Sequence, residues 1–398
     1  MDKLFHSWNE AAHPKQPRIT DDTLRDGLQA PNITMPTLEE KLRLIDCMGK
    51  NSVDCAILSY PAASRQFFEE TAVMLRYVSE RWKIMPSLAG RTAFSDLKPI
   101  ADLQQYAGRQ IKAYAFIGCS PIRQSVEHWD SCFICGCIKD SMRFLVAEGA
   151  YPSLVIEDST RCGPEILKEI ARCGVEHGAK SIVLADTVGH INPGGVRALL
   201  ALVRGVIGPD ISLEWHGHND RGLALANALT AIACGADCIH ANALGIGERT
   251  GNVALEQLLV NLWLDGCPGI DLSHLCEYAA LTAQYTHTEI PPYLPVVGSD
   301  SFTTGTGVHA AAIVKALGEG NIALADSVYS SVPASLLGRA QDIEVGQMSG
   351  KGNVKAKLRV LGLPDSEENI QRILVAAKTS SRFLTDGEIK QIVSEGCT

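Results

Sequence analysis

The sequence lacks any apolar stretch of the roughly 20 residues that a membrane-spanning helix requires, and its start, MDKLFHSWNEAAHPKQ, has no hydrophobic run typical of a secretory signal. It also lacks clusters of Lys or Arg. Over 398 residues, 36 basic side chains face 45 acidic ones, a formal charge of −9. This balance argues against nucleic acid or an anionic membrane as a partner. We therefore expect a soluble, cytoplasmic protein.

The cysteines form no disulfide or zinc framework. Thirteen of them, an odd number, are spread through a long chain, whereas disulfide scaffolds are small and cysteine-dense. The densest group, Cys132, Cys135 and Cys137, has no second CxxC or histidine pair at the spacing of a zinc site. We predict reduced thiols buried on an apolar helix.

Short β-rich segments recur eight times in the first 250 residues. Their spacings of 26 to 41 residues match β-α-β crossovers. Helix starts fall between them, with a capping box at Thr37–Glu40 and an N-cap followed by proline at Asn192–Pro193. This alternation predicts an α/β fold, a closed (β/α)8 TIM barrel, with a doubly wound open sheet as the alternative. The segments are centred near Ile19, Ala56, Met85, Tyr114, Val155, Val183, Leu213 and Ile239.

The pattern changes near residue 290, where IPPYLPVVG reads as an extended linker. Beyond it no strand-crossover repeat is found. We therefore assign four regions: an N-terminal extension (1–17), the TIM-barrel domain (18–288), a proline-rich linker (289–299), and a small, mainly helical C-terminal domain (300–398).

Polar clusters follow five of the predicted strands, where TIM barrels carry their chemistry. His216 and His218 are two residues apart on the seventh strand, so their imidazoles share a face. Asp26 follows the first strand and Asn252 the eighth, and these strands are neighbours in a closed barrel. These four side chains predict a mixed nitrogen and oxygen site for Mn, Zn, Mg or Co. An isolated HxH pair is otherwise typical of solvated loop histidines.

Two further side chains suggest catalysis. Arg25, beside Asp26, carries a permanent charge that fits a carboxylate or a developing enolate oxygen, although a surface ion pair is its simpler interpretation. Glu157 ends the fifth strand and is a candidate base, with Arg161 as its expected partner. The segment GIGERTGN (245–252) lacks the GxGxxG spacing and does not open a β-α-β unit, which argues against a nicotinamide cofactor.

The motifs DTLRDG (22–27), EDSTR (157–161), DTVG (186–189), HGHND (216–220) and GIGERTGN occur in an order and spacing that resemble the DRE-type TIM-barrel metallolyase superfamily. Within it the chain looks most like the 2-isopropylmalate, homocitrate and citramalate synthases. The resemblance implies a metal-dependent Claisen condensation of acetyl-CoA with a 2-oxo acid, giving a 2-substituted malate. It also implies a homodimer in which the second domain of one subunit completes the active site of the other.

The resemblance also implies residue roles. Arg25 would polarise the 2-oxo group, Thr187 would bind the keto-acid carboxylate, and Glu157 would deprotonate the methyl group of acetyl-CoA. The implied metal ligands are Asp26, His216, His218 and Asn252; the implied catalytic residues are Arg25, Glu157, Glu248, His309 and Tyr329; and the implied substrate-binding residues are Arg25, Gln29, Arg123 and Thr187.

Three positions depart from the synthase pattern. The segment Gly27-Leu28-Gln29 has the sequence that is typical of 3-hydroxy-3-methylglutaryl-CoA lyases. Ile57 and Ser59 stand on the second strand where a glutamate is usual. Arg123 replaces a histidine at the end of the fourth strand. A lost carboxylate and a gained guanidinium suggest an acceptor with an extra anionic group, such as a carboxylate or phosphonate; drift at a solvated rim is the alternative. A hydroxyacyl-CoA lyase is the main rival function, but the cysteine of such lyases is absent at Gly247-Glu248-Arg249. A catalytically silent barrel is a further alternative.

Overall fold

The computed structural model describes residues 9, 16–51 and 53–395, so most of the predicted extension 1–17 lies outside the described residues. Eight parallel strands close into a barrel in chain order, with β1 paired to both β2 and β8. The predicted (β/α)8 barrel is confirmed. The strands are β1 (Arg18–Asp21), β2 (Cys55–Ser59), β3 (Met85–Arg91), β4 (Lys112–Gly118), β5 (Tyr151–Glu157), β6 (Ser181–Asp186), β7 (Ser212–Gly217) and β8 (Cys238–Ala241).

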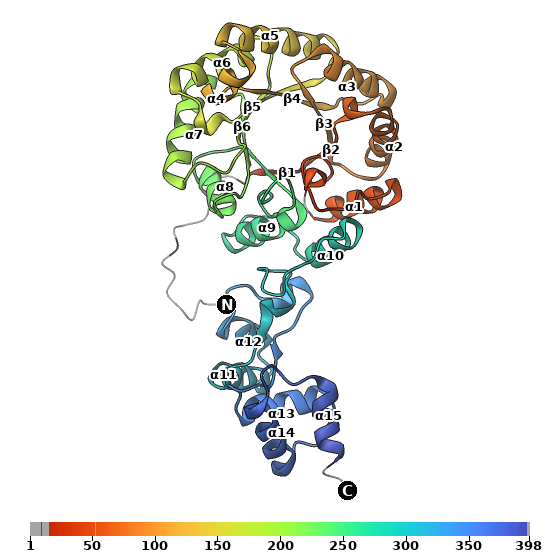
Figure 1. The fold of residues 1–398 in the computed structure, drawn as a ribbon, viewed down its shortest axis with the longest axis vertical. Helices are drawn as coiled ribbons and strands as arrows, with labels where there is room; N and C mark the ends of the chain where they lie inside the picture. Colours follow the sequence, from red (N-terminus) through yellow and green to blue (C-terminus); the bar gives the residue numbers. More distant parts are fainter. Residues whose placement is uncertain (1–8, 10–15, 52, 396–398) are drawn as a thin grey trace. The chain divides into compact units, whose positions relative to one another are not determined.

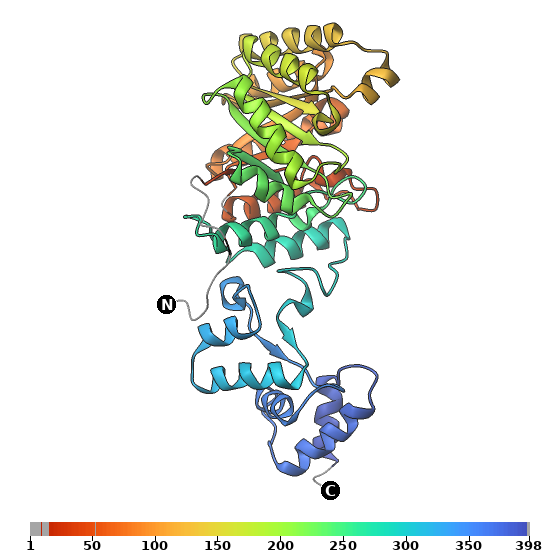
Figure 2. The ribbon, with the colours of Figure 1, turned by 90° about the vertical axis from the view of Figure 1, so that its left-hand side faces the viewer.

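Helices surround the strands in both views (Figure 1 and Figure 2). The two expected helix starts are confirmed: the Thr37 hydroxyl accepts from Glu40 N while the Glu40 carboxylate accepts from Thr37 N, and the Asn192 side chain accepts from Gly195 N. The barrel helices are α1 (Leu38–Lys50), α2 (Arg65–Arg81), α3 (Phe94–Ala107), α4 (Pro121–Glu127), α5 (Ser131–Ala147), α6 (Pro164–Glu176), α7 (Pro193–Ile207), α8 (Ala224–Ala233), α9 (Leu255–Leu264) and α10 (Leu275–Thr286).

The barrel interior is partly polar. Lys112 on β4 and Glu214 on β7 form a buried ion pair, with Nζ 2.6 Å from Oε1. The Tyr114 hydroxyl donates to the other Glu214 oxygen at 3.1 Å, and His240 Nε2 lies 3.2 Å from it. This network, which we call the interior network, places hydrogen-bonded polar groups where such barrels usually hold aliphatic side chains, although His240 Nδ1 has no hydrogen-bond partner among the described residues.

The chain divides into two compact units between Glu289 and Ile290. The second unit is mainly helical, as predicted, and has its own apolar core, in which Val354, Ile370 and Ile389 are fully buried. Its elements are β9 (Thr303–Thr304), α11 (Gly307–Gly318), α12 (Ile322–Val328), β10 (Asp342–Ile343), α13 (Lys351–Val360), α14 (Glu367–Thr379) and α15 (Asp386–Ser394).

The cysteines match the prediction only in part. No disulfide joins cysteines of the described residues. The group around Cys135 does lie on a helix, α5, but Cys132 is exposed and Cys135 and Cys137 are only half-buried. The expectation of buried thiols was therefore wrong for Cys132 and holds only in part for Cys135 and Cys137, because the fully buried side of α5 is formed by Ile134, Ile138, Met142 and Leu145. In the described part of the chain, no helix has the length and apolarity needed to cross a membrane.

Candidate active site

A cavity of about 260 Å³ is lined largely by residues at or near the carboxyl ends of the barrel strands. We call it the central cavity. Seven of its residues belong to the polar motifs that follow the strands, and its remaining wall is largely apolar or aromatic. The lining residues are Arg25, Asp26, Gln29, Ile57, Tyr60, Ala89, Tyr114, Phe116, Val155, Glu157, Ala185, Thr187, His216, His218, His240 and Glu248.

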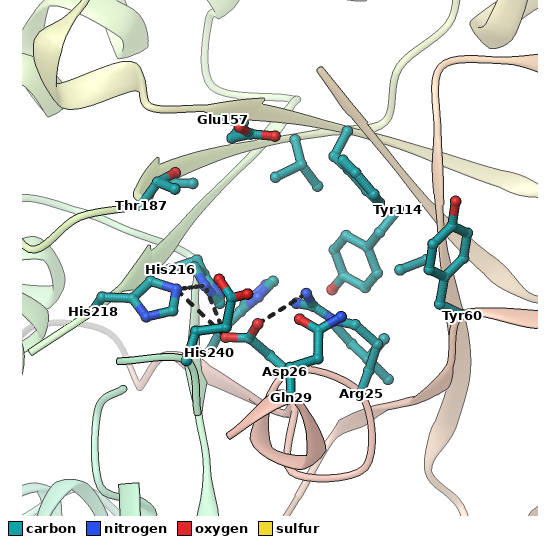
Figure 3. A pocket seen from close by; sticks show the side chains of 16 residues that line it. Arg25, Asp26, Gln29, Tyr60, Tyr114, Glu157, Thr187, His216, His218 and His240 are labelled. Atoms are coloured by element: carbon teal, nitrogen blue, oxygen red, sulfur yellow. Dashed lines mark hydrogen bonds and ion pairs between the residues drawn. The ribbon is translucent and has the colours of Figure 1, made fainter. Parts of the chain in front are cut away.

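Asp26, His216 and His218 point toward one another (Figure 3). The two Nε2 atoms lie 3.3 Å apart, and Asp26 Oδ2 lies 3.6 Å from His216 Nε2 and 3.5 Å from His218 Nε2. All three side chains are nearly inaccessible to solvent. Their donor atoms therefore form a buried triangle with almost equal edges.

The triangle fits a divalent cation. Ligands about 2.1 Å from a tetrahedral centre are separated by roughly 3.4 Å, close to the observed edges. Two neutral imidazole nitrogens this close repel unless a proton or a cation lies between them. Asn252 donates a hydrogen bond to Asp26, and its own Oδ1 is buried without a partner among the described residues. The amide is thus adjacent to the triangle and has an oxygen to offer.

Local electrostatics favour the ligating forms. Burial would raise the pKa of Asp26, but Arg25 and the two histidines outweigh it and lower that pKa well below its usual range. Burial lowers the pKa of both His216 and His218, which leaves their imidazoles neutral. Neutral imidazoles and an ionised carboxylate are the states that bind metals.

Arg25 is held at the cavity by two carboxylates. Its Nε donates to Asp22 Oδ1 at 2.9 Å, and its Nη1 lies 3.2 Å from Asp26 Oδ1. Asp22 is fully buried, and its Oδ2 also lies 3.7 Å from His216 Nδ1. Burial raises the pKa of Asp22 to about 7, although Arg25 opposes this. Asp22 therefore orients the arginine and lies close behind His216, the position from which carboxylates commonly support metal-binding histidines.

Glu157 lies across the central cavity from the histidines (Figure 3). We expected Arg161 to pair with Glu157, but Arg161 instead forms a two-bond ion pair with Asp158. Arg123 Nε instead lies 3.7 Å from Glu157 Oε1. Burial raises the pKa of Glu157 and Arg123 counteracts it. The backbone explains why Arg161 pairs with Asp158 and not with Glu157. Asp158 has a left-handed φ of 58°, so Arg161 lies over Asp158 in the short turn that follows.

The expected catalytic residue Glu248 and the remaining expected substrate-binding residues separate into two groups. Gln29, Thr187 and Glu248 line the central cavity, and the Thr187 hydroxyl accepts from Asp158 N at 2.8 Å. Arg123 does not line it. Its guanidinium pairs with Glu127 at 3.0 Å and lines an adjoining cavity of about 460 Å³.

Glycine shapes the loop that carries Glu248 and Asn252. Gly251 has a φ of 81°, and a Cβ there would lie 1.9 Å from the carbonyl oxygen of Gly245. Only glycine allows the backbone segments around Gly245 and Gly251 to approach each other this closely. The approach also brings Asn252 N within 2.8 Å of Gly245 O, which fixes Asn252 beside Asp26.

Several cavity residues were missed by the sequence analysis. Tyr60, Tyr114 and His240 all line the central cavity. His240 was detectable as a polar residue within an apolar strand, and its ring packs edge-on against that of His216 with centroids 5.5 Å apart. Tyr60 and Tyr114 carried no signal, because tyrosine is ordinary in strands and their neighbours come from distant segments.

His309 and Tyr329 lie in the second unit. Their rings stack with centroids 3.9 Å apart, so the fold brings these two predicted acid–base residues together. Their participation in a shared site stays a prediction.

Fold and cavity together define a TIM-barrel protein with a buried His–His–carboxylate group and a flanking arginine at its carboxyl-end rim. The HMGL-like family model matches residues 16–282, and the chain belongs to this family. The predicted resemblance is confirmed at this level.

Curated relatives extend over nearly the whole chain. Homocitrate synthase AksA of Methanopyrus kandleri is 29% identical over 96% of this chain and 92% of its own length. A putative (R)-citramalate synthase from the same organism is 28% identical (97% and 74%), as is a homocitrate synthase of Saccharolobus solfataricus (95% and 79%).

Solved structures are similar in fold. The hydroxymethylglutaryl-CoA lyase of Pseudomonas aeruginosa gives a TM-score of 0.58 at 20% identity, covering 68% of this chain and 93% of its own. The HMG-CoA lyase of Brucella melitensis gives 0.57 at 18% identity, covering 69% and 99%. At these identities the likeness concerns the barrel alone.

Proposed function

We propose that the chain is an acyltransferase that catalyses a metal-dependent Claisen condensation of acetyl-CoA with a 2-oxo acid, releasing CoA and a 2-substituted malate. The observation that carries the proposal is the convergence of the Asp26–His216–His218 triangle, Arg25 and Glu157 on one cavity. The names of the relatives, which are homocitrate and citramalate synthases, support the same class of reaction.

The donor set fits a divalent metal, held by Asp26, His216 and His218 with Asn252 adjacent. Such an ion would supply Lewis acidity to the 2-oxo group of the acceptor. Arg25 is aimed into the same cavity and would stabilise the negative charge that develops on that oxygen when the new carbon–carbon bond forms. Thr187 offers a hydroxyl for the carboxylate of the acceptor.

Glu157 is the proposed base for the methyl group of the thioester. A methyl thioester is a weak acid, so its proton must be removed by a positioned group of raised basicity. Burial raises the pKa of Glu157, and its carboxylate faces the central cavity opposite the triangle. Hydrolysis of the resulting thioester makes the condensation effectively irreversible.

The acceptor is proposed only as a 2-oxo acid. An extra anionic group would have to reach Arg123, which lies in the adjoining cavity beyond Glu157. The lining of the central cavity includes the apolar residues Ile57, Ala89, Phe116 and Val155, which favours an apolar substituent on the acceptor. Comparing 2-oxo acids with and without a second carboxylate or a phosphonate tests this point directly.

The test is release of free CoA from acetyl-CoA in the presence of each 2-oxo acid. We expect release that depends on the acceptor, stops with a chelator and falls at least about 100-fold in Glu157→Gln. Glu165→Gln, at an exposed position on α6, is the matched control and should retain full activity. Cleavage of a hydroxyacyl-CoA without any condensation would instead establish a lyase and refute the proposal.

A further inference from the structure

The central cavity is too small for a whole acyl-CoA. Its volume of about 260 Å³ is below the roughly 300–1,000 Å³ of sites that bury a drug-sized ligand, and coenzyme A is larger than such a ligand. If the acetyl group reaches Glu157, the pantetheine arm and the adenosine must therefore extend into neighbouring space.

One neighbouring cavity adjoins the central cavity. The cavity of about 460 Å³ shares two lining residues with it, Phe116 and Glu157. A different cavity, beside the strand-8 loop, shares none. The 460 Å³ cavity, which we call the side cavity, thus begins at the carboxylate that is proposed to receive the methyl proton.

The side cavity leads onward to an aromatic groove between α3 and α5. The groove shares Thr92, Phe133 and Cys137 with the side cavity and has a volume of about 450 Å³. Phe94, 66% exposed, and Phe133, 48% exposed, lie in it. Two such rings beside one groove are costly to leave in water and are suited to a flat, aromatic partner.

Aromatic rings in this region already pack against one another. Trp129 and Phe133 lie 5.3 Å apart at a 31° tilt, and Phe94 packs edge-on against Phe144 at 5.2 Å. The face of Trp129 also receives Arg123, whose Cζ lies 5.8 Å from the ring centroid. Aromatic faces of this kind bind nucleobases by stacking.

The side cavity has polar groups that suit the middle of the same ligand. Thr92 and Arg123 offer hydrogen-bond donors to pantetheine amides, and Arg123 Nε makes no hydrogen bond among the described residues, although it lies 3.7 Å from Glu157 Oε1. Arg91 lines the same cavity, and 63% of its side chain is exposed. An ion pair with Asp96 holds its guanidinium in place, and the guanidinium offers a cation for a diphosphate.

From this series of adjoining cavities we infer that the acyl-CoA lies along the side cavity, with pantetheine beside Arg123 and adenine stacked in the aromatic groove against Phe94 and Phe133. The inference rests on the proposed use of acetyl-CoA and adds the route and the adenine subsite. It also gives the exposed phenylalanines of α3 and α5 a function.

A truncated thioester separates adenine recognition from chemistry. Acetyl-pantetheine retains the acetyl group and the pantetheine arm but lacks the adenosine. Phe94→Ser and Phe133→Ser should raise the KM for acetyl-CoA about tenfold, within the range that removal of one base-stacking ring produces, and leave kcat/KM for acetyl-pantetheine within about twofold of wild type. Tyr106→Ser, an equally exposed aromatic on α3 that lines neither cavity, is the matched control and should change neither value.

Binding of unreactive CoA, measured by calorimetry, keeps this test independent of the reaction. Weaker CoA binding in both phenylalanine variants, with the control unchanged, supports the subsite even if no 2-oxo acid is turned over. Equal loss with both thioesters, or unchanged binding and kinetics, overturns the inference while leaving the proposed condensation intact. A change of oligomeric state in the variants with CoA binding unaltered would also overturn it and identify the groove as a protein interface.

Discussion

The buried pair of Lys112 and Glu214 gives a sharp prediction about what stabilises the barrel beneath the active site. Lys112 Nζ lies 2.6 Å from Glu214 Oε1, and both residues are almost fully buried. At an effective dielectric constant of about 20, two charges this close attract by roughly 6 kcal/mol, much of which offsets the cost of removing them from water. Lys112→Met would remove this attraction but leave the free-energy cost of burying the Glu214 carboxylate away from water.

Breaking such a pair typically costs about 3–5 kcal/mol. Glu214 keeps hydrogen bonds from Tyr114 and Ser212, so we expect the lower end, about 3 kcal/mol, for Lys112→Met. Glu214→Gln should lower the free energy of unfolding by a similar amount, because it leaves the Lys112 ammonium buried without an opposite charge. The double variant should recover more than half of the summed loss, since neither charge is then left alone.

The assay is urea unfolding followed by tryptophan fluorescence, since all five tryptophans lie before residue 290 and Trp215 is fully buried in the barrel. Burial would raise the pKa of Glu214, but Lys112 and His240 outweigh it and lower that pKa. Its contribution is therefore present above the unfolded-state pKa of a glutamate and lost in acid, so the measurement belongs at neutral pH. Lys98→Met, in an exposed pair with Asp102, is the control and should cost under about 0.5 kcal/mol. Equal effects of Lys112→Met and Lys98→Met, or strictly additive losses in the double variant, would refute the reasoning.

Three further predictions concern the site and its scaffold. Arg123→Gln removes the charge that opposes the burial-raised pKa of Glu157, so the acid limb of kcat/KM should move to higher pH; an unmoved limb would exclude this coupling. Gly251→Ala should cost about 1–3 kcal/mol in urea unfolding and abolish activity, because its Cβ meets the Gly245 carbonyl, whereas Gly269→Ala, at a similar φ in open space, should leave activity unchanged. Thr37→Ala should lower the free energy of unfolding by about 1 kcal/mol through loss of the α1 capping box, and a change under a few tenths would contradict that role.

The barrel was predictable because each strand is a short apolar segment whose spacing is set locally by one helix and two loops. The location of the motifs at strand ends followed from the same periodicity. Pairing of side chains across the rim was less predictable: the expected Glu157–Arg161 contact was wrong because a left-handed residue, Asp158, redirects the turn.

The interior network was also beyond sequence reasoning. Lys112, Tyr114, Glu214 and His240 come from three strands, and each looks like an isolated polar residue along the chain. Only closure of the barrel places them within hydrogen-bond distance. Arg123 shows the same limit, since its sequence position indicates the rim but not which of two adjoining cavities it lines.

The most direct test of the proposed catalytic centre is the metal content of the purified protein, measured by elemental analysis for wild type, His216→Ala and His218→Ala. Two imidazole nitrogens and a carboxylate oxygen within 3.6 Å of one another should hold about one divalent ion per chain, and either substitution should remove that ion together with acceptor-dependent CoA release. Stoichiometric metal and undiminished turnover in either variant would contradict the account.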